Sequence, residues 1–218
     1  MRNARERAYP MLNCGVQSIP PKMSLNEFLA AQRETDDGGS VAPGTQSEWL
    51  FLCDYKVYGN FVQLIEKRLL GDLRGGVIAE LASGMYVIEA QVITYAEARH
   101  ISRMRVCPQG IECSLGDKID EVHVVEGGLA ISDVDALARA LDADPKGFRD
   151  WHKDLLIESY EVAGVAYWPR GNMEFPFVEG GFGEDYYPVY ALMAGAKAAG
   201  VEVEYIPPGT PYPTRSKW

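Results

Sequence analysis

Short apolar stretches in which every second residue is polar constrain the fold of this chain more than any other feature. The clearest lies at residues 86–92, where Glu89 and Gln91 fall on the face opposite the apolar side chains. The apolar members of this stretch are Tyr86, Ile88, Ala90 and Val92. Because successive side chains of a strand point to opposite faces, the pattern predicts a strand in a sheet with one wet face.

Similar runs predict further strands along the chain, and turn residues separate them. These strands are expected at residues 49–53, 100–106, 119–125, 162–168, 175–178, 187–193 and 201–206. Gly127-Gly128 is interpreted as a hairpin turn, and the segment 195–200 is expected to join the last two strands as a hairpin.

Helix signals are fewer, and they depend mainly on capping residues. Ser24 and Glu27 have the spacing of a capping box, which predicts a short helix to about Gln32. A second helix is predicted behind the Ser132-Asp133 cap, and a third behind Asp144-Pro145. Helical spacing also occurs between residues 61 and 69, with Gly71 placed to end that helix, and its apolar members are Phe61, Leu64, Ile65 and Leu69.

Strands therefore outnumber helices, and the helices are grouped rather than alternating with strands. We expect an α+β fold with a mainly antiparallel sheet and a few flanking helices. Residues 34–47 are polar and contain Gly and Pro, as in a flexible loop. Residues 1–48 are accordingly predicted to be an N-terminal extension with a short helix, and residues 49–218 to be a single α+β domain.

The charge of the chain limits its partners. Its 31 acidic and 21 basic residues give a formal net charge of −10. Binding to a phosphate backbone requires clustered Lys and Arg, so direct nucleic-acid binding is not expected. An acidic surface instead favours a basic protein partner, because opposite charges speed the encounter.

The cysteines and the length of the apolar runs indicate the cellular compartment that we expect for this chain. The four cysteines lack the spacing and the His partners of a zinc site, so free thiols in a reducing cytoplasm are expected, with no cofactor. They are Cys14, Cys53, Cys107 and Cys113. The longest apolar run, Val189 to Ala194, has six residues and is too short to cross a membrane.

The segment 179–190 is the most unusual stretch, because three glycines and three carboxylates fall within seven residues. Its carboxylates, Glu179, Glu184 and Asp185, have three interpretations. They could bind a divalent cation, since hard oxygen ligands suit such ions, or act as an acid and base pair. Alternatively, the glycines shape a bend into a strand and the carboxylates are solvated.

Aromatic residues are dense in the last third of the chain, and three of them are candidate contact residues. Trp168, Tyr186 and Tyr187 are the candidates, and Trp168 precedes a possible recognition loop at Pro169-Arg170-Gly171. Tyr and Trp are enriched among interface residues that contribute most to binding, although they are also ordinary residues of strands.

Three segments resemble a bacterial family of unknown function over about residues 77–206. The family has a late Gly-Asp-Gly-x-Tyr-Pro-Val-Tyr segment, and here Gly183-Glu184-Asp185-Tyr186-Tyr187-Pro188-Val189-Tyr190 stands in its place, with Glu184 and Asp185 replacing its Asp and second Gly. Upstream, Ser83 through Val87 resembles its opening strand, and Glu126 through Asp133 resembles another of its Gly- and Asp-containing stretches. The resemblance implies an all-β or α+β domain of bacterial origin without an established activity. Such domains occur among proteins linked to contact-dependent toxin systems, which implies an immunity or interaction role.

Three hypotheses follow for the function. The first is a cytoplasmic binding protein whose acidic, aromatic surface occupies a basic partner, such as a toxin that it neutralises. The second is a metal-dependent hydrolase with ligands from the segment 179–190 and from Asp133 or Asp135. The third is a structural or oligomerising module, and the sequence does not specify an oligomeric state.

Overall fold

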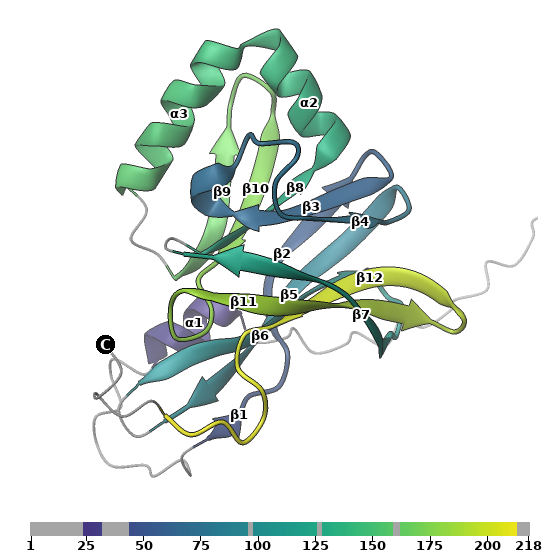
Figure 1. Ribbon diagram of the computed structural model, residues 1–218, viewed down its shortest axis with the longest axis vertical. Helices are drawn as coiled ribbons and strands as arrows, with labels where there is room; N and C mark the ends of the chain where they lie inside the picture. Colours follow the sequence, from purple (N-terminus) through teal and green to yellow (C-terminus); the bar gives the residue numbers. More distant parts are fainter. Residues whose placement is uncertain (1–23, 32–43, 96–97, 126–127, 159–161, 213–218) are drawn as a thin grey trace, which may run out of the picture.

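The fold was analysed in a computed structural model that describes residues 24–31, 44–95, 98–125, 128–158 and 162–212. Two antiparallel sheets and a pair of helices form three layers (Figure 1). The N-terminal part contains α1 (Leu25–Ala31), β1 (Thr45–Gln46), β2 (Leu50–Val57), β3 (Phe61–Glu66), the 3-10 turn η1 (Lys67–Leu69), β4 (Val77–Glu80) and β5 (Gly84–Thr94). The remainder contains β6 (Arg99–Pro108), β7 (Ser114–Val124), β8 (Leu129–Asp133), α2 (Val134–Ala143), α3 (Pro145–Glu158), β9 (Ala163–Trp168), β10 (Met173–Val178), β11 (Asp185–Ala194) and β12 (Lys197–Glu204).

The larger sheet has the order β1-β5-β6-β12-β11-β7, with β2 also paired to β5, and the smaller has the order β4-β3-β8-β10-β9. Every pairing of named strands among the described residues is antiparallel. The expectation of a mainly antiparallel fold with a few helices is confirmed at this level. The expected terminal hairpin is also present, because Ala194 pairs with Lys197 where β11 turns into β12.

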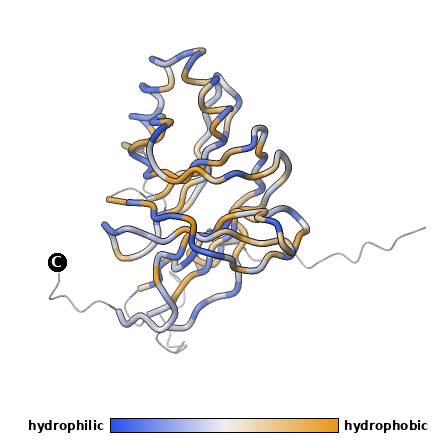
Figure 2. Tube along the Cα trace, turned by 45° about the vertical axis from the view of Figure 1, so that its right-hand side comes forward, coloured by the Kyte–Doolittle hydropathy of each residue, from blue (hydrophilic) through white to orange (hydrophobic). Residues whose placement is uncertain are grey.

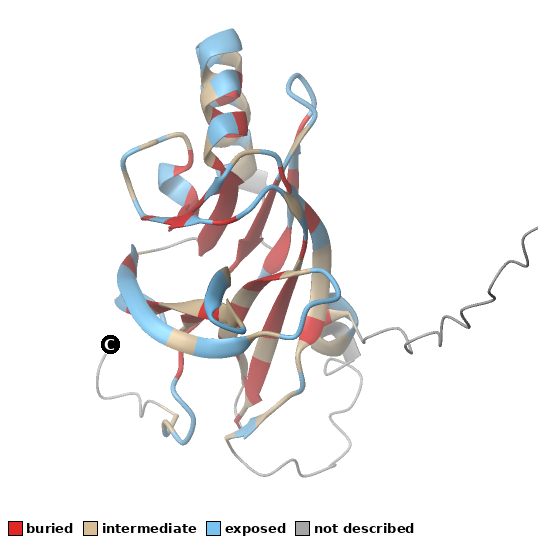
Figure 3. Ribbon diagram, turned by 90° about the vertical axis from the view of Figure 1, so that its right-hand side faces the viewer, coloured by how far each residue is buried: buried red, intermediate tan, exposed pale blue. Residues whose placement is uncertain are grey.

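Two hydrophobic clusters separate the three layers. The larger lies between the two sheets and includes Ile88 and Met104 of the seven-stranded sheet and Leu64 and Ile131 of the five-stranded sheet. The smaller lies between the five-stranded sheet and the helices, where Phe148 of α3 contacts the rings of neighbouring aromatic residues. Hydropathy alternates along many of the strands, as Figure 2 shows, and buried segments concentrate where the layers meet (Figure 3).

Local capping explains where each helix begins. Ser24 Oγ accepts a hydrogen bond from Glu27 N, and the Glu27 carboxylate accepts one from Ser24 N, which forms the expected capping box. Asp133 caps α2 by accepting from Ala136 N, and Asp144 accepts from Gly147 N at the start of α3.

The N-terminal segment contributes to the main core. Leu25 of α1 is fully buried in the larger cluster, and β1 pairs with β5. The expected extension, residues 1–48, therefore supplies at least one core residue and a short strand to the fold. Its expected flexible loop lies mainly in residues 32–43, outside the described residues.

Two secondary-structure predictions are wrong. Residues 61–66 form the strand β3 rather than a helix, because β3 is an inner strand of the smaller sheet and both of its faces are covered. Burial on both faces removes the alternation that marks a strand, and the remaining spacing matched a helix by chance. The predicted hairpin at Gly127-Gly128 is also wrong, since β7 and β8 on either side of it belong to different sheets; Gly127 itself lies outside the described residues.

The outer face of β5 is not wet, which is a further correction. Glu89 is only 2 % exposed and its carboxylate binds Arg105 of β6 at 2.6 Å. Arg105 also lies over the Trp49 ring, 4.0 Å from its centroid. Arg103 continues the row by pairing with Glu202 and Glu204 of β12. A row of ion pairs thus crosses three strands of the larger sheet.

Candidate functional site

The late loop, residues 179–184, joins β10 to β11. Four hydrogen bonds with surrounding elements hold it in place. Glu179 N donates to Val162 O (2.6 Å), and Gly181 N donates to Ile101 O (3.0 Å). His100 Nδ1 lies 3.1 Å from Gly181 O, and the Tyr187 hydroxyl donates to Gly183 O (2.6 Å). The loop is therefore anchored both to β6 and to its own following strand.

Glycine is required at two positions of this loop. Gly181 and Gly183 have φ angles of +75° and +124°, which side chains of other residues rarely allow. A Cβ at Gly181 would also stand 2.4 Å from the Tyr187 hydroxyl oxygen. The expectation that these glycines shape a bend into a strand matches this geometry.

The loop directs its carboxylates to different sides. Glu184 and Asp185 are exposed, whereas Glu179 is half-buried and lines a cavity between the sheets. Among the described residues, no group of three or more His, Cys, Asp or Glu side chains has a geometry that could hold a metal ion. The three carboxylates therefore do not converge on one point.

Asp133 and Asp135, the other expected metal ligands, lie where α2 begins, at the opposite end of β8 from the late loop. Both oxygens of Asp133 are engaged, since Oδ2 accepts from Tyr58 N (2.7 Å) and Gly59 N (2.8 Å) and Oδ1 accepts from Ala136 N (2.7 Å). Asp135 is exposed on α2. Capping accounts for Asp133, and no described carboxylate of the late loop approaches it closely enough to form a metal site.

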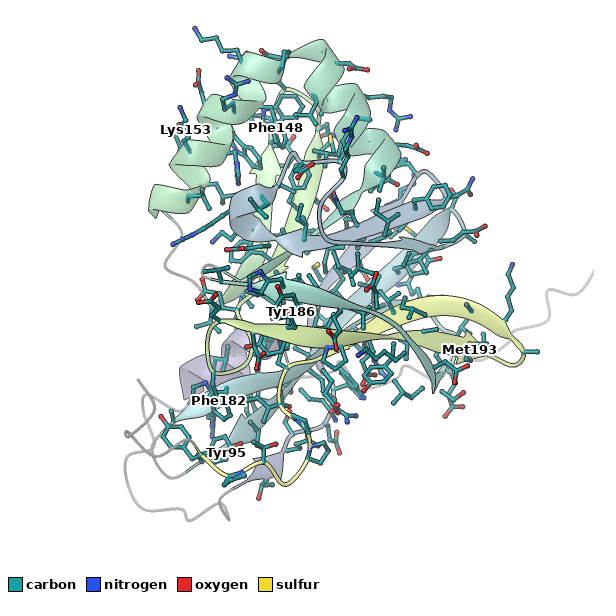
Figure 4. All side chains as sticks on the ribbon, viewed as in Figure 1. Tyr95, Phe148, Lys153, Phe182, Tyr186 and Met193 are labelled. Atoms are coloured by element: carbon teal, nitrogen blue, oxygen red, sulfur yellow. The ribbon has the colours of Figure 1, made fainter. Side chains whose placement is uncertain are left out.

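The exposed part of the expected site forms a small acidic surface on β7 and β11. Tyr186 is 60 % exposed and stacks on His123 of β7, with ring centroids 4.3 Å apart and an interplanar angle of 15°. Glu184 Oε1 lies 3.7 Å from His123 Nε2, and Glu121 lies opposite Pro188 in the same ladder. We call Glu121, His123, Glu184, Asp185 and Tyr186 the acidic surface; Figure 4 labels Tyr186.

Two of the expected contact residues face the interior instead. Tyr187 is 4 % exposed and packs edge-on against Tyr205, and burial raises the pKa of its hydroxyl. Trp168 is 2 % exposed and belongs to the smaller cluster. Trp168 pairs with Met173, at the opposite end of the β9–β10 ladder from Val178, so it lies roughly 17 Å along the strand from the late loop.

Trp168 does line a cavity of about 340 Å³ beside α2, together with Tyr58, Arg139 and Arg170. Arg170 forms an ion pair with Asp144, the residue that caps α3. The segment Pro169-Arg170-Gly171 thus connects the β9–β10 hairpin to the helices and is separate from the acidic surface.

Sequence reasoning missed three residues at the late loop: His123, which stacks on Tyr186, and Arg99 and His100, which begin β6. Each lies more than fifty positions from the loop in the chain, and only strand pairing brings them to it. The thiols of Cys53 and Cys107 supply no ready nucleophile. Burial raises the pKa of Cys53 to about 12 and that of Cys107 to about 11, so both stay protonated near neutral pH.

No known protein family, curated protein or solved structure matched this chain in the comparisons made with each. No helix among the described residues is long and apolar enough to span a membrane.

Proposed function

We propose that this protein binds a basic protein partner through the acidic surface and the neighbouring edge of β7. The observation that carries the proposal is the joint exposure of Glu184, Asp185 and Tyr186 beside a sheet edge. Acidic side chains around a rigid exposed tyrosine combine electrostatic steering with an aromatic contact, as protein interfaces commonly do.

The edge of β7 adds a second means of contact. β7 is the last strand of the larger sheet, and no described strand pairs with its outer edge. Leu115 and Ile119 on this strand are 50 % and 47 % exposed. An extended segment of a partner can add to such an edge through backbone hydrogen bonds.

The resemblance to a family linked to toxin systems supports a more specific proposal, in which the partner is a basic toxin that this protein neutralises. The proposal places the protein in the cytoplasm. Cys53, Cys107 and Cys113 are free thiols, which fits a reducing compartment.

The exposed apolar residues of β7 favour one other function, namely self-association of two copies edge to edge. In that case the oligomeric module would bury Leu115 and Ile119 between subunits. Light scattering of the purified protein distinguishes the two, because a dimer at micromolar concentration that dissociates on Ile119→Lys would assign the edge to self-association.

The main test compares two variants with equal charge changes. In the first, Glu121→Gln, Glu184→Gln and Asp185→Asn neutralise the acidic surface. In the control, Asp142→Asn, Asp150→Asn and Asp154→Asn neutralise three exposed carboxylates of α2 and α3. Both proteins are used to capture partners from native lysate of the source cells, and association with each captured partner is measured at rising salt.

A partner that wild type and the helix control bind, and that the surface variant loses, supports the proposal. Its association rate should fall with salt, because the acidic surface is exposed and is screened. Equal recovery of all partners by both variants, or recovery of none by wild type, contradicts it.

A further inference from the structure

A cavity of about 330 Å³ opens at the end of the sandwich where β6 begins and β7 ends. The late loop forms one wall with Glu179 and its glycines, and the start of β6 forms another with Arg99 and His100. Ile101, Val124 and Val162 supply an apolar surface between them. Small-molecule sites commonly have this size and this combination of apolar walls with a few polar groups.

Among the described residues, the cavity is lined by one cation, Arg99, and one anion, Glu179, which do not form an ion pair with each other. Arg99 donates to Phe28 O (2.9 Å) and stacks over the Phe28 ring, and its Nε is buried without a hydrogen-bond partner among the described residues. No described side chain forms an ion pair or a hydrogen bond with the half-buried Glu179 carboxylate. A buried polar group without a hydrogen-bond partner is unfavourable, so a ligand that pairs with Arg99 Nε and with the Glu179 carboxylate would gain from the arrangement.

His100 adds a hydrogen-bond acceptor, its Nε2 atom. Its Nδ1 faces Gly181 O, and because a carbonyl oxygen only accepts, Nδ1 carries the proton. Burial lowers the pKa of His100, so the ring is neutral near pH 7 and Nε2 is a hydrogen-bond acceptor. Nε2 is buried and has no partner among the described residues.

Phe182, which completes the loop, packs against the Tyr95 and His100 rings at centroid distances of 5.9 and 5.0 Å (Figure 4). These contacts hold the loop over the start of β6, so the two walls that carry Glu179 and Arg99 are held against each other. A fixed pair of opposite charges selects ligands by the spacing of their own charges.

We infer that this cavity binds a small zwitterion with an apolar side chain, that is, an α-amino acid. Arg99 would bind the carboxylate, Glu179 the ammonium group, and Ile101, Val124 and Val162 the side chain. This site lies on the inner side of the late loop, and it does not depend on the proposed partner at the acidic surface.

The test uses L-leucine and two analogues that each lack one charge: isocaproate has no ammonium group and isoamylamine has no carboxylate. Binding to the full-length protein is measured by calorimetry at pH 7.5. We expect saturable binding of leucine and binding of each analogue that is weaker by about tenfold or more, since each lacks one charged hydrogen bond.

Glu179→Gln should weaken the binding of leucine by about tenfold or more but leave the affinity for isocaproate unchanged, because isocaproate makes no contact that needs the Glu179 carboxylate. Glu174→Gln, an exposed change on β10 outside the cavity, is the matched control and should bind leucine as wild type does. Thermal melting of each variant verifies that the fold is retained.

No saturable binding of leucine at millimolar concentration overturns the inference, and so does equal affinity of wild type and Glu179→Gln for leucine. Arg99→Gln provides a second test with the opposite selectivity. It should weaken the binding of leucine and isocaproate but not that of isoamylamine. Because Arg99 also holds α1 through Phe28, its melting temperature is compared with wild type before its affinities are interpreted.

Discussion

The ring of Tyr205 lies directly against the backbone of Gly180. A Cβ placed on Gly180 would stand 2.4 Å from Tyr205 Cδ2, a distance that side-chain carbons do not adopt. Tyr205 follows β12 and is 5 % exposed, and Gly180 forms a bridge with Ile101 of β6. The late loop thus closes onto the larger sheet only because residue 180 has no side chain.

Gly180→Ala is therefore expected to destabilise the protein by about 1–3 kcal/mol, since either the Tyr205 ring or the loop must move. Urea denaturation measures the change. Gly84→Ala is the matched control, because the nearest side-chain atom to a Cβ there is 4.0 Å away. The control should change the free energy of unfolding by less than about 1 kcal/mol, and a similar loss in both variants would contradict the steric argument.

Asp133 joins β8, α2 and the turn after β2 through a single buried carboxylate. Asp133→Ala should cost about 3 kcal/mol, because it removes the cap of α2 and leaves the Tyr58 and Gly59 amides without an acceptor. Asp133→Asn retains one acceptor oxygen, so its free energy of unfolding should fall between those of wild type and Asp133→Ala. Asp142→Ala, an exposed change near the end of α2, should have little effect on the denaturation midpoint.

The helices and the hairpins could be predicted from sequence where their cause is local. The cap residues Ser24, Asp133 and Asp144 act within three positions of themselves, so their spacing alone indicates where each helix begins. The turn between β11 and β12 is equally local. These predictions needed no knowledge of the neighbouring layers.

Features that depend on which neighbouring element covers a strand or side chain could not be predicted from local sequence patterns. Residues 61–66 became an inner strand because α2, β4 and β8 surround them, and Trp168 became a core residue because α3 packs over it. The same applies to Glu89, whose burial depends on Arg105 of the adjacent strand. At the candidate site, the exposed carboxylates were found from the sequence, whereas His100 and His123 reach the loop only through long-range pairing.

Burial lowers the pKa of both His100 and His152 from the usual value of 6.5. Between pH 6.5 and the lower folded pKa, the unfolded chain binds more protons than the folded one, so the free energy of unfolding falls as pH falls. Their stabilising contribution is fully present above about pH 6.5. Glu202 has the opposite effect on stability, because burial raises the pKa of its carboxyl from 4.5. The folded chain therefore binds more protons than the unfolded one just above pH 4.5, and this contribution to the free energy of unfolding rises as pH falls.

The variant His100→Asn/His152→Gln tests this pH dependence. Asn and Gln place an amide N–H where His100 Nδ1 faces Gly181 O and where His152 Nε2 donates to Lys67 O (2.7 Å), but neither titrates. Urea denaturation is measured at intervals from pH 7.5 to about 5, a range that spans the usual histidine pKa. The variant should lose less stability than wild type over this range, and an identical slope in both proteins would rule out the two histidines as its source.

The ion pair between Glu89 and Arg105 provides the last test, because its two members are withdrawn from water to different extents. The Glu89 side chain is 2 % exposed and that of Arg105 17 %. Glu89→Leu alone should destabilise the protein by about 3 kcal/mol, since it leaves the Arg105 guanidinium group, which lies over the Trp49 ring, without its ion-pair partner.

Adding Arg105→Met should recover part of that loss, because replacing both charges by apolar side chains removes the cation that has lost its ion-pair partner. The exposed pair Lys118–Glu121, with both side chains 46 % exposed, is the comparison, and its removal should change stability by less than about 1 kcal/mol. Urea denaturation of the two single variants and the double variant gives the coupling energy between Glu89 and Arg105. If the double variant is less stable than Glu89→Leu, the row of ion pairs stabilises the sheet through contacts other than charge neutralisation.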